Sequence, residues 1–532
     1  MPFPKYEVRA VWLTTIGGID WPHSFSNGSS SAIANQKQEL IQILDKLKKA
    51  NINTVLIQTR VRGTTIYPSD IEPWDGCLSG KPGMSPGYDA LQFAIDECHK
   101  RGMECHAWVV TMPIGKWNKA GCQNMRKTHP ELVRKIADDG FMNPEHPGTA
   151  PYIARICKEI VSRYDIDGIH LDYIRYPDGW RINVSRSTGR DYITNIVREV
   201  HDVVKSLKPW VKMSCSPVGK FNDLARYSSH GWNAYHAVCQ DAQGWLREGL
   251  MDQLYPMMYF RDNQFFPFAA DWQENSYGRT VAPGLGIYFL DPREGKWQLT
   301  DVTRQLHVLR DLGMGHTYFR SKFFTDNTKG IYDYVINNID PFPALVPPMT
   351  WENKLQPTTP DGFSVNRGSM YTTLSWNQNS SVAQQTYYNV YASRNYPVDI
   401  SDVRNLIAQR VERNNLTIAT NKEYFYALTA VNRYGVESVP VQSVSKGKGQ
   451  SANMLSHNNK VLVLPEMTQL SNARYVTIET PQGNIVATLP ITKDKKRKPV
   501  IDIRKINDGV YVIKTLDKRG IVHRVGMFTV KR

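Results

Sequence analysis

Hydrophobic runs of strand length alternate with amphipathic stretches of helical period from Glu7 to about Phe324. The runs that predict strands are Glu7–Thr15, Asn53–Val61, Glu104–Met112, Asp167–Tyr176, Val211–Gly219, Met251–Phe260, Val281–Phe289 and Gly315–Phe323. Helices are predicted at Gln36–Asn51, Tyr88–Gly102, Pro151–Asp165, Arg190–Lys208, Ala242–Gly249 and Thr300–Gly313. This alternation predicts a (β/α)8 barrel, or TIM barrel, for residues 1–340. A doubly wound open sheet is the alternative, but no glycine-rich phosphate turn follows the first strand.

The pattern changes to short strands joined by turns after residue 340. Residues 341–355 are rich in proline and predict a linker. Residues 356–446 resemble a fibronectin type III module, with Trp376 as a core aromatic and the strongest likeness at 424–438. Residues 453–532 predict a second small sandwich, similar to C-terminal sorting or anchoring domains of exported Bacteroidetes proteins. The prediction is therefore a TIM barrel followed by two small all-β sandwich domains.

The net charge of +15 is concentrated at one end of the chain. The stretch Lys446–Arg532 contains 17 Lys or Arg against 6 Asp or Glu, which leaves the large N-terminal part nearly neutral. Its basic run, Lys493–Lys498, is interpreted as a solvated loop, with an acidic polymer or a membrane surface as the alternative partner. We therefore expect no nucleic-acid partner.

The cysteines and the hydrophobic runs indicate neither a zinc site nor a membrane span. The seven cysteines form no CxxC pair and are interpreted as small buried apolar residues. No apolar stretch approaches the roughly 20 residues that cross a bilayer. A predicted strand follows Met1 almost directly, so we expect any export signal to have been trimmed or never to have existed.

The sequence DGIHLDYIRY, residues 167–176, ends an apolar run in a cluster of polar groups. Side chains alternate along a strand, so His170 and Asp172 are predicted to face the barrel axis. Ile169, Leu171 and Tyr173 are predicted to face the helices. Asp172 would then stand at the barrel mouth, where active sites of this fold lie. We expect Arg175 to lower the pKa of Asp172 and keep it ionised, as a nucleophile, a general base or a stabiliser of positive charge. A purely structural ion pair would have the same sequence.

Polar and aromatic residues share the predicted strand ends with Asp172. Aromatic faces stack on sugar rings, and Arg, Gln and His hydrogen-bond to hydroxyl groups, so their joint placement suits a polysaccharide cleft. Each alone is typical of core or rim packing. The predicted substrate-binding residues are Arg60, Arg62, His106, Trp108, Arg175, Tyr259 and Tyr288. Trp12, Gln58, Tyr67 and Arg320 also fall at strand ends.

A second carboxyl group is expected because glycoside hydrolysis places one on each side of the scissile bond. Asp241 precedes a predicted helix after the fifth strand and is the first candidate, although Asp also favours the N-cap. Glu72, after the second strand, is the other candidate. Asp167, at the entry of the fourth strand, is interpreted as a turn or capping residue. A carboxyl separation of about 5–5.5 Å would indicate retention, and roughly 6.5–9.5 Å inversion.

Seven ordered motifs resemble those of a known family. They are RAVWLTT, IQTRVRG, YPSDIEPW, PGYDALQFAIDECHKRGMECHAW, DGIHLDYIRYP, QDAQGWLREG and YPMMY. Through them residues 7–325 resemble the bacterial glycosyl-hydrolase-like ten family of (β/α)8 glycoside hydrolases. The resemblance implies an exported enzyme that acts on a cell-surface or environmental glycan, such as the glycan strands of peptidoglycan. It favours as site residues Asp172, Arg60, Arg62, His106, Asp241 and Tyr259.

The leading hypothesis is an exported glycoside hydrolase, without cofactor or metal, in which Asp172 acts as nucleophile or base. Asp241, or else Glu72, would protonate the leaving oxygen. The expected location is periplasmic, outer-membrane-associated or secreted, with cell-envelope association through the C-terminal β-domains. A non-catalytic glycan-binding barrel is the alternative. A third hypothesis is metal-assisted hydrolysis or deacetylation, but the candidate histidines show no HExxH spacing. Those histidines are His99, His106, His129, His146 and His170.

Overall fold

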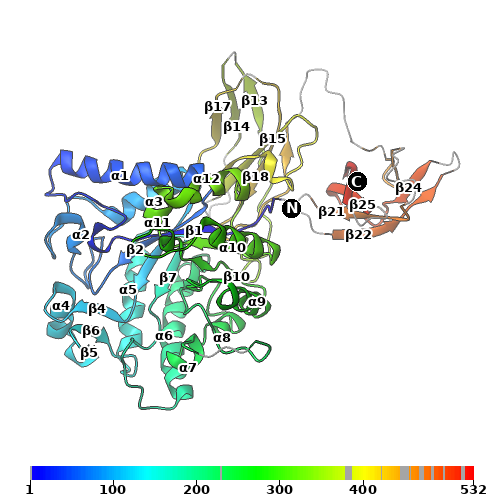
Figure 1. Cartoon of the computed structure of the whole chain (residues 1–532). Coiled ribbons are helices and arrows are strands. Elements are labelled where there is room, and N and C mark those ends of the chain that lie inside the picture. Colours follow the sequence, from blue (N-terminus) through cyan, green and yellow to red (C-terminus); the bar gives the residue numbers. More distant parts are fainter. Residues whose placement is uncertain are drawn as a thin grey trace. The chain divides into compact units, whose positions relative to one another are not determined.

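The computed structural model forms two compact units (Figure 1). The larger unit is Tyr6–Glu352, and the smaller one joins Met1–Lys5 to Asn353–Arg532. The described residues are 3–227, 231–368, 370–377, 386–420, 422–443, 455, 457–465, 473–480, 485–494, 498–516 and 522–532.

Parallel strands form the centre of the larger unit (Figure 1). They are β1 (Arg9–Leu13), β2 (Thr54–Arg60), β3 (Glu104–Val110), β7 (Gly168–Asp172), β8 (Lys212–Cys215), β9 (Gln253–Leu254), β10 (Thr280–Val281), β11 (Gly284–Leu285) and β12 (His316–Tyr318). The strand order is β10-β9-β8-β7-β3-β2-β1-β12-β11. Only Ala282 and Pro283 separate β10 from β11, so one chain segment pairs with β9 on one side and with β12 on the other. The sheet therefore closes on itself, which confirms the predicted TIM barrel.

Helices connect the strands around the outside of the barrel. They are α1 (Ser30–Lys49), α2 (Gly76–Ser79), α3 (Ala90–Lys100), α5 (Thr149–Arg163), α6 (Arg186–Leu207), α7 (Ala234–Ala237), α8 (Ala242–Arg247), α9 (Phe266–Glu274), α10 (Leu299–Asp311), α11 (Ser321–Thr325) and α12 (Ile331–Tyr334). Four of them begin before the predicted first residue, and α1 and α6 do so by the most residues. The side chain of Ser29 caps α1, and Ser185 Oγ accepts a hydrogen bond from the backbone N–H of Thr188 (3.0 Å) at the start of α6.

The barrel strands are buried on both faces, as is usual for parallel sheets. Ile169 and Leu171 of β7 pack in the core between barrel and helices. His170 lies inside the barrel, where Trp12 Nε1 donates to its Nε2 (3.2 Å). The predicted alternation along β7 is thus confirmed up to Asp172. The predicted seventh strand, in contrast, is interrupted at Pro283, which has no N–H to donate to a ladder.

A small antiparallel sheet is inserted between β3 and α5 (Figure 1). It consists of β4 (Pro113–Lys116), β5 (Val133–Ile136) and β6 (Asp139–Met142), and α4 (Ala120–Thr128) lies between β4 and β5 in the chain. The sequence pattern did not predict this sheet. It matters because β4 and β6 form one wall of the pocket described below.

A buried ion cluster lies at the amino end of β1. Arg9 and Arg310 both bind the carboxylates of Glu7 and Asp340, and His316 Nε2 lies 3.1 Å from Asp340 Oδ2. Burial alone would raise the pKa of Asp340, but Arg9, His316 and Arg310 outweigh it and lower the pKa to about 2. The cluster lies at the amino-terminal end of the barrel, opposite the end where active sites of this fold lie.

Much of the predicted linker, 341–355, packs on the barrel. Tyr6 pairs with Leu345, and Trp351 Nε1 donates to Asp252 Oδ1 (2.7 Å). The barrel unit accordingly extends through Glu352, beyond the predicted end at residue 340.

The smaller unit contains two β-sandwiches. The first pairs β13 (Ser364–Arg367), β14 (Thr372–Ser375) and β17 (Asn415–Ile418) in one sheet with β15 (Tyr387–Ser393), β16 (Leu406–Val411), β18 (Phe425–Val431) and β19 (Val441–Gln442) in the other. The second pairs β20 (Val461–Val463), β23 (Thr492–Lys493) and β24 (Pro499–Asp502) with β21 (Tyr475–Glu479), β22 (Ile485–Pro490), β25 (Gly509–Leu516) and β26 (Val522–Val530). Each sandwich has one shared core, and Trp376 lies in the first, as predicted.

Several sequence-based statements about this unit stay predictions. The fibronectin type III identity and the likeness to sorting domains are untested. The boundary at 446–453 and residues 495–497 of the basic run Lys493–Lys498 lie outside the described residues. The cysteine interpretation is confirmed, since all seven are buried and free. Among the described helices, none has the length and apolar character needed to cross a bilayer.

Candidate active site

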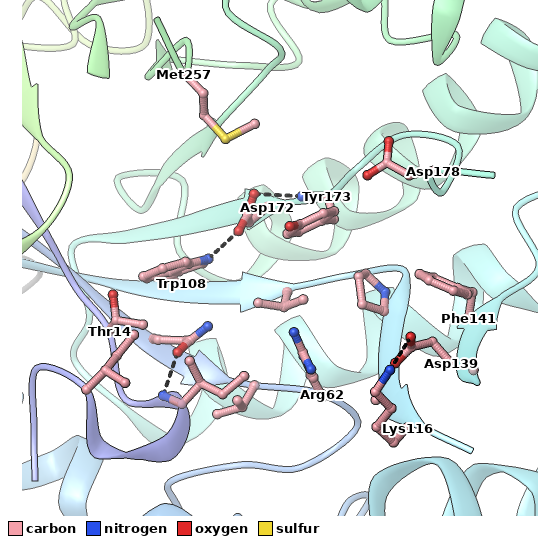
Figure 2. A pocket seen from close by; sticks show the side chains of 18 of the residues that line it. Thr14, Arg62, Trp108, Lys116, Asp139, Phe141, Asp172, Tyr173, Asp178 and Met257 are labelled. Carbon is pink, nitrogen blue, oxygen red and sulfur yellow. Dashed lines mark hydrogen bonds and ion pairs between the residues drawn. The ribbon is translucent and has the colours of Figure 1, made fainter. Parts of the chain in front are cut away.

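A pocket of about 660 Å³ opens at the carboxyl ends of the barrel strands (Figure 2). Loops after β1, β2, β3, β7 and β9, together with the inserted sheet, form its walls. The lining residues are Thr14, Ile16, Ile19, Gln58, Val61, Arg62, Trp108, Val110, Pro113, Gly115, Lys116, Asp139, Gly140, Phe141, Asp172, Tyr173, Asp178, Met257, Tyr259 and Phe319. Such a volume is typical of a small-ligand site.

Asp172, the last residue of β7, lies in the middle of this pocket and is 5% exposed (Figure 2). Its Oδ2 accepts a hydrogen bond from Trp108 Nε1 (3.0 Å). Its Oδ1 accepts from Ser216 Oγ (2.8 Å) and from the backbone N–H of Tyr173 (2.8 Å). Together the three donors hold the carboxyl group in one orientation.

Burial raises the pKa of Asp172 above that of an exposed aspartate. The three donors, and Arg175 after them, oppose this rise without cancelling it. Arg175 lowers the pKa of Asp172, as expected, but burial outweighs it, so the expectation of a lowered net pKa is wrong. Arg175 forms its ion pair with Asp178 (3.0 Å).

Tyr173 departs from the alternation that the sequence predicts. It lies beyond the end of β7, its φ is 54°, and its side chain is 37% exposed and lines the pocket. A left-handed backbone is costly for a residue with a Cβ and concentrates at functional sites. The turn brings the ring into the pocket beside Asp172, so the predicted orientation toward the helices is wrong.

Charged groups on the opposite wall come from the β2 loop and the inserted sheet. Arg62 is exposed, and no ion pair to it is found in the described part of the chain. The turn at Gly63 (φ 67°) holds Arg62 against the start of α4, where a Cβ on Gly121 would lie 2.0 Å from the Arg62 carbonyl oxygen. Lys116 pairs with Asp139 (2.8 Å) across β4 and β6. The pocket thus combines Asp172 with a free guanidinium and a rim ion pair.

Four of the predicted site residues line this pocket, namely Asp172, Arg62, Trp108 and Tyr259. Tyr288 does not, but its ring packs against Tyr259 (centroids 5.7 Å apart) and supports the wall. Arg175 lies behind the pocket and holds Asp178, which does line it.

Arg60 and Glu72 form a buried pair away from the pocket. Arg60 Nε and Nη2 donate to the two carboxylate oxygens of Glu72 (2.8 and 2.7 Å), and Tyr152 Oη also donates to Glu72 (2.9 Å). Arg60 additionally bonds to the carbonyl of Thr111 (2.8 Å). The register of β2 shifts between Gln58 and Arg60, and the place of Arg60 at the strand end does not bring it into the pocket. The structure gives both residues a structural role.

His106 lies inside the barrel below the pocket and is fully buried. Its Nε2 is 2.9 Å from Glu104 Oε2, and Lys212 Nζ binds the other oxygen of Glu104 (2.7 Å). His106 was predicted as a substrate-binding residue at the barrel mouth, but it is two residues deeper along β3 than Trp108 and does not line the pocket.

Asp241 lines a second cavity and is not among the residues that line the Asp172 pocket. Its carboxylate caps α8 by accepting from the backbone N–H of Gly244 (3.1 Å). The cavity measures about 870 Å³ and is lined by residues of α6, by the two residues that flank α8, by Tyr235 of α7 and by the loop before α5. The structure therefore does not bring the two predicted carboxyl groups together in one pocket.

Sequence reasoning missed several residues that line the pocket or hold Asp172. Ser216 has a findable signal, since it follows Ser214 by two positions on the inward face of β8. Asp178 and Asp139 have none, because one lies on an irregular loop and the other in the unpredicted sheet. Thr14 also lines the pocket, and its hydroxyl oxygen is buried.

The histidines of the metal hypothesis are engaged separately. His99 pairs with Asp167 (2.8 Å), which also accepts from the backbone N–H of Cys105 (2.9 Å), so Asp167 has structural contacts. Within the described ranges, one group of side chains could share an ion, Glu7, His316 and Asp340. Arg9 and Arg310 already neutralise its carboxylates, so its donors do not fit a cation.

Comparison with known proteins assigns the chain to a family. The model of the family described as glycosyl hydrolase-like 10 matches residues 7–183 and 183–287, more than half of the chain. The chain belongs to the glycosyl hydrolase-like 10 family. Membership makes it a glycoside hydrolase by class. Of the residues that line the Asp172 pocket, all but Phe319 fall within the match.

Similar proteins extend the likeness along the chain. Glycosyl hydrolase YngK of Bacillus subtilis is 28% identical over 494 residues, which cover 83% of this chain and 93% of the relative. Glycosyl hydrolase DigH of Escherichia coli K12 is 32% identical over 289 residues, 48% of this chain and 65% of the relative. Among solved structures, the PgaB (BpsB) glycoside hydrolase domain from Bordetella bronchiseptica is 15% identical, with a TM-score of 0.44, and covers 62% of this chain and 98% of the domain.

Proposed function

We propose that this glycosyl hydrolase-like 10 protein cleaves glycosidic bonds within a cell-wall or environmental polysaccharide, and that peptidoglycan glycan strands are the first substrate to test. One observation carries the proposal. A single buried carboxyl group, Asp172, is held by three donors at the barrel mouth, in a pocket that also presents exposed tyrosine and arginine side chains. Export to the periplasm, outer membrane or medium, and envelope association through the β-domains, stay predictions.

Asp172 acts in this proposal as the general acid. Its pKa is raised by burial, so it keeps a proton to a higher pH than an exposed aspartate does. The proton passes to the glycosidic oxygen while the bond from that oxygen to the anomeric carbon breaks. Asp139 or Asp178, which line the same pocket, supplies the second carboxylate that activates water or attacks the sugar. This role replaces the nucleophile or base role predicted from sequence.

The direct test is product analysis on a panel of purified glycans. Peptidoglycan, chitin, cellulose and xylan are each incubated with the protein, and new reducing ends are quantified and sized by mass spectrometry. We expect cleavage of at least one of them, with peptidoglycan the strongest candidate. Absence of new ends on all four glycans, from protein shown to be folded by circular dichroism, would contradict the proposal for these substrates.

The pH profile of a Ser216→Ala variant tests the role of Asp172. Ser216 donates to the ionised carboxylate and so lowers its pKa, and removing the hydroxyl raises the pKa further. A hydrogen bond to a charged group is worth about 1.5–3 kcal/mol, and one pKa unit about 1.4 kcal/mol, so the shift is about one unit or more. A general acid is active when protonated. The limb on which activity falls with rising pH therefore moves to higher pH.

Ser214→Ala is the matched control, because Ser214 contacts His170 and not Asp172. It should leave that limb in place. If Ser216→Ala instead moves the limb on which activity rises with pH, Asp172 acts in its ionised form and the general-acid assignment fails.

A further inference from the structure

Arg175 is held between two aromatic rings at the edge of the pocket. Its guanidinium carbon lies 4.9 Å from the centroid of the Tyr173 ring and 5.0 Å from that of Trp232. Its nitrogens also bind both oxygens of Asp178 (3.0 and 3.2 Å). The Arg175 side chain is only 4% exposed, so the rings and Asp178 cover it.

The two rings are themselves open to solvent. Tyr173 is 37% exposed and Trp232 is 51% exposed, and neither belongs to the hydrophobic core of the barrel. A cation over the face of a ring occupies that face, so the exposed area belongs to the rest of each ring. Single exposed aromatic residues are common, but these two flank the same guanidinium beside a pocket, and adjoining exposed apolar area of this kind is typical of a ligand-binding groove.

Only one of these rings lies in the pocket. Tyr173 and Asp178 line it, whereas Trp232, on the loop between β8 and α7, does not. Because both rings lie within about 5 Å of the same carbon, Trp232 continues the wall of the pocket outward from Tyr173. Neighbouring sugars of one chain could contact the two rings in turn.

We propose that Trp232 forms an outer subsite that binds a sugar ring of the glycan beyond the pocket, so that the enzyme prefers long chains to short fragments. The inference rests on the proposed function and adds to it. Aromatic rings stack on the apolar C–H faces of sugars and need no fixed pattern of hydroxyl groups. The subsite therefore accepts polysaccharide segments built from different sugars. Arg175 is a positioning residue here, since it holds both rings and Asp178 at the edge of the pocket.

The test compares chain lengths. Peptidoglycan glycan fragments of two, four and eight sugars are given to the wild type and to Trp232→Ala, and kcat/KM is measured for each. We expect the substitution to lower kcat/KM on eight sugars about tenfold, equivalent to about 1.4 kcal/mol of lost binding. On two sugars it should change little. Trp232→Phe should restore part of the loss, because a smaller ring can still stack.

Tyr277→Ala is the matched control. Tyr277 is also an exposed aromatic residue, 49% exposed, but it precedes β10 at the opposite end of the barrel. It should leave the length preference unchanged. An equal loss on two and eight sugars would show that Trp232 only props Tyr173, and a wild type without length preference would overturn the subsite.

Binding separates this inference from the proposed function. Calorimetry with the two-sugar and eight-sugar fragments, in an Asp172→Asn background, requires no hydrolysis. Weaker binding of eight sugars after Trp232→Ala supports the subsite even if no product forms. Product formation with length-independent binding and kcat/KM rejects the subsite and keeps the hydrolase.

Discussion

Replacing Asp172 by Asn lowers the rate of glycosidic cleavage by about 10²- to 10⁴-fold, the range that a positioned general acid contributes. The amide has nearly the same shape but cannot deliver a proton to the leaving oxygen. Ser216 and the backbone N–H of Tyr173 can still donate to the amide oxygen, so the variant should fold and bind glycan. The measurement is kcat on the glycan that the wild type cleaves, with glycan affinity measured in parallel.

Asp241→Asn is the matched control for this substitution. Asn serves as an N-cap about as well as Asp, so the start of α8 should remain intact. Asp241 lines the second cavity, and its loss of charge should leave kcat within a small factor of the wild type. If Asp241→Asn abolishes activity and Asp172→Asn does not, the catalytic centre lies in the second cavity.

Glu72→Ala destabilises the barrel by about 3–5 kcal/mol, the usual cost of leaving one partner of a buried ion pair alone. Arg60 is fully buried and loses two charge-assisted hydrogen bonds, and Tyr152 loses its acceptor. The measurement is urea unfolding followed by tryptophan fluorescence. The free energy of unfolding is compared with that of the wild type.

Asp70→Ala provides the comparison, since the Asp70–Arg163 pair is exposed and exposed pairs contribute little. It should barely move the urea midpoint. A Glu72→Ala protein as stable as the wild type, yet without activity, would restore Glu72 as the catalytic acid and contradict the structural role.

The barrel could be predicted from the sequence because its signal is repetitive. Each strand is an apolar run and each helix has a period of 3.6, so an error in one element does not alter the count. Asp172 was also predictable, because β7 is regular up to its last residue. The prediction failed one residue later, where the left-handed backbone of Tyr173 ends the alternation.

The partners of Asp172 were less predictable because they depend on contacts between distant segments. Arg175 is close to Asp172 in sequence, but its geometry favours Asp178. Arg60 stands at a strand end, yet a register shift turns it toward Glu72. An Asp before a helix is equally suited to capping and to catalysis, so Asp241 could not be assigned without coordinates.

The most direct test of the account is a crystal structure of Asp172→Asn with a bound glycan of eight sugars. The account predicts that a glycosidic oxygen lies within about 2.6–3.2 Å of the residue 172 side chain, the reach of direct proton transfer. A glycan bound in the cavity beside Asp241 would contradict the account. So would a bound glycan with every glycosidic oxygen out of reach of the residue 172 side chain.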